Sequence, residues 1–226
     1  MVLSSLDDDA DTESDPLPES YADPDADTVY TLSSGGGGGS VVGGITVTAV
    51  SVIRLTGPQS HDALRKLLSS GPNVDPVDVN LPRHRMSSVR YLYDPFNLDK
   101  SKGGNGNKYD LLDQSLILKF DGPRSFTGED VVEIHCHGSR AVVSGILDAL
   151  SNLSLSEPSS SQPPPLRVRP TDPGEFTQIA YSNGRLGLCE VEALADLITA
   201  DTSSQRRQAL RQFDGRLGKL YGGWRT

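Results

Sequence analysis

Three side chains capable of acid–base or metal chemistry alternate along the segment EIHCH: Glu133, His135 and His137. In an extended strand alternate residues point to the same side, so one face would carry a carboxylate and two imidazoles. Such a set suits a transition-metal site, a hydrolase site, a polar ligand-binding surface or the solvated side of a sheet.

The rest of the sequence gives the two catalytic interpretations little support. A metal site would need more ligands, and the other histidines, His61 and His84, have no ligand-like spacing around them. A hydrolase would need an activated nucleophile, and neither a G-x-S-x-G nor a Cys–His signature occurs. We therefore predict no catalytic residue and no metal site. Ligand binding and a plain solvated face remain open.

The strand that positions these side chains follows from the hydrophobic pattern. Alternation over residues 129–137 has a period of two. Val132, Ile134 and Cys136 would face the core, whereas Val131 would share the polar face. The polar face would run into the N-terminus of a following helix, which is a favourable place for an anionic ligand.

The remaining pattern predicts a small mixed sheet with helices, an α+β or mixed α/β fold. Ser139 is the expected N-cap of the helix after the polar strand, because a serine there can accept a backbone hydrogen bond. Other strands are predicted at residues 27–34, 48–57, 85–95, 111–123 and 166–170, and helices at residues 58–69, 139–150, 188–198 and 210–220.

The net charge of -9 lies in an acidic N-terminal tail. Ten Asp and Glu residues precede Arg54, the first basic residue, so the rest of the chain is close to neutral. A neutral body lacks the basic field of a strong nucleic-acid binder. The tail, residues 1–27, is predicted to be disordered, and it resembles neither an import presequence nor a membrane span. Cys136 and Cys189 fall in predicted ordered elements, which indicates a reducing compartment.

Gly-rich and Pro-rich segments are predicted to be flexible inserts at about residues 34–44, 97–109 and 154–165. The second insert partly matches the sequence of a phosphate-binding loop. However, Tyr109 stands where that loop needs a Ser or Thr to bind Mg²⁺. We therefore expect this chain not to bind GTP.

Apolar residues near the C-terminus, Leu210, Phe213, Leu217 and Leu220, recur at steps of three, four and three. Such a seam belongs to a helix that packs against partner helices. Residues 186–226 are accordingly expected to be the start of an incomplete helical domain, within a longer protein.

Four blocks resemble one known family in their order along the chain: DTVYTLSS, VSVIRLTGP, LLDQSLILKFDGPRSFTGEDVVEIHCHGS and RPTDPGEFTQIAYSNGRLGLCEVEALADLITADTSSQRRQALR. They are similar to the N-terminal domain and first helices of the tRNA-modifying GTPase MnmE, or TrmE, over roughly residues 27–220. The resemblance implies that residues 28–185 form a domain similar to the tetrahydrofolate-binding domain of aminomethyltransferases.

The resemblance also implies a function. Members of this family form homodimers through this domain and bind 5-formyl- or 5,10-methylene-tetrahydrofolate. With an FAD protein of the MnmG (GidA) type they modify carbon 5 of the wobble uridine of tRNA. The resemblance implies no membrane association and, in a eukaryote, a mitochondrial location. GTP, Mg²⁺ and K⁺ would bind only to a GTPase domain whose motifs do not occur in this sequence.

Three residues match the family's folate-binding positions: Arg54, Glu133 and Arg185. The resemblance thus identifies the polar strand face as a pterin-binding face. A carboxylate can accept two adjacent pterin N–H groups, and cations suit a glutamate tail or a ring carbonyl. Arg185 stands where members commonly carry Lys, and Gly187 where they carry Asp, so the site departs from the family pattern there.

Two other functions stay open. The departures at Arg185 and Gly187 would suit a dimerisation and scaffolding module without folate binding. The shared fold would suit a folate-dependent aminomethyltransferase-like enzyme, although the PGEFT block and the helices after it favour the GTPase family. A folate titration separates the scaffold from the two folate-binding alternatives.

Overall fold

The computed structural model describes residues 26–33, 40–42, 45–69, 79–98, 109–155 and 165–213. Within these ranges the chain forms a six-stranded mixed sheet, a two-stranded sheet and five helices, which confirms the predicted α+β class. The acidic tail up to residue 25, most of the three predicted inserts and residues 214–226 lie outside the described residues. The prediction of a disordered tail falls there.

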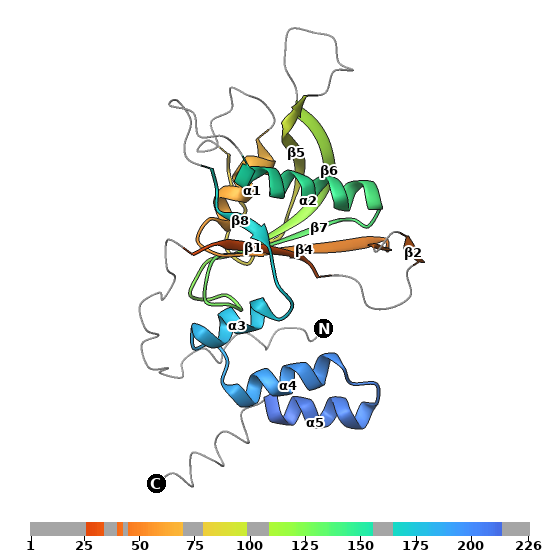
Figure 1. The fold of residues 1–226 in the computed structure, drawn as a ribbon, viewed down its shortest axis with the longest axis vertical. Coiled ribbons are helices and arrows are strands. Elements are labelled where there is room, and N and C mark those ends of the chain that lie inside the picture. The colour runs from red at the N-terminus through yellow and green to blue at the C-terminus, as the bar shows by residue number, and fades with distance from the viewer. Residues whose placement is uncertain are drawn as a thin grey trace, which may run out of the picture.

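The main sheet has the strand order β5-β6-β7-β4-β1-β8 (Figure 1). Neighbouring strands are antiparallel except for β1 and β8, which are parallel. Its strands are β1 (Thr28–Leu32), β4 (Val50–Thr56), β5 (Ser88–Leu98), β6 (Tyr109–Phe120), β7 (Val131–His137) and β8 (Val168–Pro170). The helices are α1 (Ser60–Leu68), α2 (Arg140–Leu155), α3 (Glu175–Ser182), α4 (Leu188–Ile198) and α5 (Ser203–Phe213).

Helices α1 and α2 cover one face of the main sheet, and the hydrophobic core lies between them and the strands (Figure 1). Val132, Ile134 and Cys136 of β7 are buried there, as the alternation predicted. Burying a large aliphatic side chain contributes about 1.5–3 kcal/mol, so this face fixes which way β7 presents its other side chains. Ser139 caps α2 as predicted, because its Oγ accepts the Val142 N–H at 3.3 Å.

The strand register confirms the predicted face of Val131, but its burial has a separate cause. Val131 lies on the side of Glu133, yet it is almost fully buried. The reason is that the loop before β7 folds back over this end of the face. Thr56, the register partner of Val131, bonds the side chains of Thr127 and Glu129 in that loop. The polar face is therefore covered at one end and open at the other.

A second small sheet pairs β2 (Ser40–Val42) with β3 (Ile45–Val47), antiparallel. Strand β2 falls inside the predicted insert at residues 34–44. The β-branched composition of Ser-Val-Val and Ile-Thr-Val favours strand structure, a signal that the neighbouring glycines obscure in the sequence.

Helix α3 lies on the side of the sheet opposite α1 and α2, and the α4–α5 hairpin extends beyond it (Figure 1). The predicted helix at 188–198 is confirmed, whereas its apolar face is not covered by the described residues: Leu188 and Ile198 are largely exposed. The two helices instead contain buried small residues, Ala193 and Ala209. No helix in the described ranges is long and apolar enough to cross a membrane.

Gly57 is the position at which the turn between β4 and α1 tolerates no side chain. Its φ is +134°, and a Cβ there would lie 2.6 Å from the Thr28 Cα. We predict that Gly57→Ala lowers the free energy of unfolding by at least about 3 kcal/mol, since backbone cannot move aside cheaply. Urea denaturation followed by circular dichroism measures this.

Gly184→Ala is the matched control, because Gly184 also has a positive φ, +65°, but nothing lies within 4 Å of its added Cβ. Backbone strain alone should cost about 1 kcal/mol there. Equal losses for the two variants would contradict the importance of the Gly57–Thr28 contact.

Candidate functional site

Arg54 and Glu133 face each other across two central strands. They are register partners in the β4–β7 pair, and the Arg54 Nε lies 3.1 Å from the Glu133 Oε1. Their side chains are 27% and 23% exposed, so each can still meet a ligand from solvent. Because neighbours Ile53 and Ile134 are fully buried on the other side, the core fixes this pair on the open face.

Two aromatic rings flank the Arg54 guanidinium. Its Cζ lies 5.6 Å from the ring centre of Phe126 and 5.4 Å from that of Phe176, within the range of cation–π attraction. The Nε is nevertheless buried without a hydrogen-bond partner, since its N–H does not point at the nearby Glu133 oxygen. The guanidinium is therefore held by charge and by aromatic contact, with its hydrogen-bonding capacity incompletely used.

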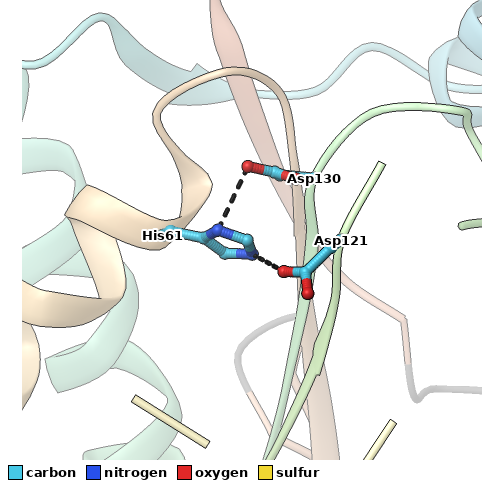
Figure 2. A group of neighbouring side chains, drawn as sticks. All are labelled: His61, Asp121 and Asp130. Atoms are coloured by element: carbon cyan, nitrogen blue, oxygen red, sulfur yellow. Dashed lines mark ion pairs between the residues drawn. The ribbon is translucent and has the colours of Figure 1, made fainter. Parts of the chain in front are cut away.

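The loop at residues 121–130, which carries Phe126, is fastened to α1 through His61. Figure 2 shows the His61 ring between two carboxylates: Nδ1 is 3.1 Å from Asp130 and Nε2 is 3.7 Å from Asp121. Burial raises the pKa of the Asp130 carboxyl, but hydrogen bonds from His61 and from the Gly122 amide outweigh burial and hold the pKa below its usual value. Lys119 also forms an ion pair with Asp121.

The sequence has no ligand-like spacing around His61 and His84, yet the fold places a carboxylate beside each of them. The fold brings Asp121 to both: it lies near His61, and its backbone N–H donates to the His84 Nδ1 at 2.8 Å. Atoms of His61, Asp121 and Asp130 lie within 4.8 Å of one another, as metal ligands would. Because Lys119 already neutralises Asp121, the contacts describe an ion-pair clamp on the loop.

A buried polar network holds the other end of the same loop. The Thr56 and Thr127 hydroxyls are 2.6 Å apart, and Thr56 also donates to Glu129 at 3.2 Å. The Asn183 amide donates to the Thr127 carbonyl at 2.8 Å, which joins the loop to the end of α3. Burial raises the pKa of the Glu129 carboxyl above its usual value. With both ends fixed, the position of Phe126 is determined.

Helix α3, which carries Phe176, is fastened to β8 and to the start of β1. Arg169 forms a two-pronged pair with the Glu175 carboxylate and lies 3.0 Å from an oxygen of Asp27. Hydrogen bonding to Arg169 lowers the pKa of Glu175 to about 2. Since Glu175 directly precedes Phe176, this pair sets where the second ring lies.

The low pKa of Glu175 leads to a prediction about acid stability. A carboxylate whose folded pKa lies below its unfolded value stabilises the fold above the unfolded pKa, near 4.5, and this contribution is lost as the pH falls toward 2. Glu175→Gln should therefore lower the free energy of unfolding at pH 7 by about 1–2 kcal/mol. This value is modest because Arg169 is partly exposed and solvent screens the ion pair.

Denaturation curves of parent and Glu175→Gln between pH 7 and pH 3 measure the difference, which should narrow below about pH 4.5. Glu192→Gln on α4 removes an exposed carboxylate and should change stability little at any pH. A gap between parent and Glu175→Gln that stays constant down to pH 3 would contradict the proposed ion pair.

Arg185, the third predicted site residue, has different neighbours from Arg54 and Glu133. It is exposed, and its side chain packs against Gly128 in the 121–130 loop. Among the described residues no ion pair joins it to Glu133. Gly187 is likewise exposed and is the N-cap residue of α4. Its backbone N–H donates a hydrogen bond to the Glu190 carboxylate at 2.7 Å.

The two histidines of the polar face differ in their surroundings. His135 lies 3.4 Å from the second oxygen of Glu133. His137 is 71% exposed, and its Nδ1 is 2.7 Å from the buried Asp113. Burial raises the pKa of Asp113, but hydrogen bonds from His137 and Ser115 outweigh it and lower the pKa. The structure therefore joins Glu133 to Arg54 and His135, and gives His137 a separate partner.

Sequence reasoning missed Phe126 and Phe176. Both lie inside the blocks FTGED and PGEFT, which carry the family resemblance, but neither follows a periodic pattern that marks a site. A single aromatic residue in each of two specific blocks was the available signal.

Comparisons with known proteins agree with this architecture. Residues 40–185 match the family model described as GTP-binding protein TrmE N-terminus. The chain is 46% identical over 197 residues to the mitochondrial 5-taurinomethyluridine-tRNA synthase subunit GTPB3 of Homo sapiens, covering 87% of this chain and 32% of that protein. It is 39% identical over 198 residues to the tRNA modification GTPase MnmE of Granulibacter bethesdensis, covering 88% and 35%.

An α+β domain with these matches is of the class that forms the N-terminal part of tRNA modification GTPases. The chain belongs to the TrmE (MnmE) family. It spans about a third of the length of the curated relatives it matches.

Proposed function

We propose that this domain binds a one-carbon derivative of tetrahydrofolate on the polar face around Glu133. The observation that carries the proposal is the Arg54–Glu133 pair, partly exposed on an open sheet face and flanked by Phe126 and Phe176. A carboxylate, a guanidinium and two aromatic rings together match a pterin, which has adjacent N–H donors, a carbonyl oxygen and a ring system.

Glu133 is the principal anchor in this proposal. Its carboxylate can accept the pterin amino group and ring N–H side by side, which a neutral imidazole such as His135 cannot do. Arg54 offers its guanidinium fork to the anionic glutamate tail or to a ring carbonyl, and Arg185 adds an exposed cation near the same loop.

The first test is Glu133→Gln. The substitution removes the charge and turns an NH₂ donor toward a pterin N–H, so affinity for 5-formyltetrahydrofolate should fall by about tenfold to a hundredfold. The fold should persist, because a partly exposed ion pair contributes at most about 1 kcal/mol. Calorimetric titration, with melting measured on both proteins, checks both statements.

His135→Gln serves as the matched control on the same face and should reduce affinity less than Glu133→Gln. Equal affinities of parent and Glu133→Gln would remove Glu133 from the site. A parent protein that binds no folate would instead support a dimerisation module without folate binding. That second function is favoured by the direct pairing of Arg54 with Glu133.

The whole protein is proposed to be a tRNA-modifying GTPase that acts on carbon 5 of the wobble uridine with an FAD-containing partner of the MnmG type. Support comes from the names of the relatives, which include a tRNA modification GTPase and a subunit of the 5-taurinomethyluridine-tRNA synthase. A mitochondrial location is proposed from the GTPB3 relatives. GTP, Mg²⁺ and K⁺ are assigned to a GTPase domain distinct from the present domain.

We also propose that the domain forms a homodimer through the open part of this sheet face. Val50, Val89 and Tyr91 are largely exposed there, and the strand registers put them on the side of His135. Val89 and Tyr91 lie two residues apart on β5, and Val50 lies on β4 with β6 and β7 between them. Exposed apolar side chains on one sheet face are typical of an interface. A two-fold pairing would present the same face from both copies.

The dimer proposal predicts a light-scattering mass of about twice that of one chain at micromolar concentration. Val89→Asp should shift the protein to a monomer, because it buries a charge at the interface. Leu155→Asp, at the end of α2, changes an exposed leucine away from this face and should leave the dimer intact. A monomeric parent would contradict the proposed interface.

A further inference from the structure

Phe126 and Phe176 stand outside the hydrophobic core formed by the described residues. Both rings are only partly buried, and both lie beside the Arg54 guanidinium. Each is carried by a separately fastened segment: His61 and Thr56 fix the loop of Phe126, and Arg169 fixes the helix of Phe176. Polar contacts, and not packing in the core, therefore set the positions of the two rings.

The Arg54 guanidinium lies beside these rings with one of its N–H groups left without a hydrogen bond. Its Nε is buried without a hydrogen bond, although the Glu133 oxygen is 3.1 Å away. A buried and unbonded N–H carries a desolvation cost. A flat ring without an N–H at that point would contact the same aromatic pair without the cost.

We propose that Phe126 and Phe176 form the contact surface for the planar pyrimidine part of the pterin ring, and that Arg54 covers this surface until the ligand enters. The inference rests on the proposed folate-binding function and adds two binding residues to it. On entry, the pterin takes the place of the guanidinium beside the rings while its N–H groups meet Glu133. Arg54 turns its fork to the anionic part of the ligand.

Paired substitutions test the aromatic contact. Phe126→Leu and Phe176→Leu keep an apolar side chain but remove the ring, whereas Phe126→Tyr and Phe176→Tyr keep the ring. Calorimetry with 5-formyltetrahydrofolate should show each Leu variant weakened by about three- to tenfold and each Tyr variant within twofold of the parent. Melting of all four variants checks that the fold is intact, and the Tyr variants stay informative if a Leu variant unfolds.

A second ligand identifies which ring of the folate is contacted. Tetrahydropterin, which lacks the aminobenzoyl-glutamate tail, should lose affinity for the Leu variants by the same factor as the full folate. If only the full folate loses affinity, the rings contact the aminobenzoyl group and the assignment to the pterin is overturned.

The movement of Arg54 has its own readout. Protons beside aromatic rings have shifted NMR resonances, so the Arg54 Nε–H signal should move when 5-formyltetrahydrofolate saturates the site. An unchanged signal at saturation overturns the exchange. If the parent binds folate and the Leu variants bind it equally well, the aromatic assignment falls while the proposed function stands. A parent that binds no folate overturns both.

Discussion

The antiparallel register of β4 and β7 is the constraint on which the site depends. It places Arg54 opposite Glu133 and Ile53 opposite Ile134, so one pair faces solvent while the other is fully buried. A slip of one residue would exchange the two faces and bury the charges. The aliphatic core beneath α1 and α2 therefore specifies the polar face indirectly, by making any other register far less stable.

Around this pair the fold builds a site from two separately anchored segments. The 121–130 loop is held at one end by an ion-pair cluster and at the other by a buried hydroxyl and carboxyl network. Helix α3 is held by the Arg169–Glu175 pair. These contacts place polar groups close to the Arg54–Glu133 face and fix the position of the two segments, while the apolar core supplies stability on the opposite side of the sheet.

Much of this arrangement was predictable because it rests on short-range patterns. Period-two alternation predicted which side of β7 carries Glu133, and Ser139 was predicted as the cap of α2. The burial of Val131 was not predictable, since it depends on a loop that folds back from the preceding segment. The approach of Asp121 and Asp130 to His61 likewise depends on tertiary structure. The family resemblance supplied Arg54 and Glu133 as a pair, and the strand register explains why they meet.

The edge strand β8 has a consequence for how the protein is made. Asp27 and Arg169 are 142 residues apart in sequence, yet they meet where β8 joins β1. Contacts of such long range form slowly, and during synthesis they must wait until the later partner has left the ribosome. The central antiparallel strands are complete by His137, whereas Phe176 follows β8 along the chain. The second aromatic ring beside Arg54 is therefore synthesised only after the central antiparallel strands and the Arg54–Glu133 pair that they carry.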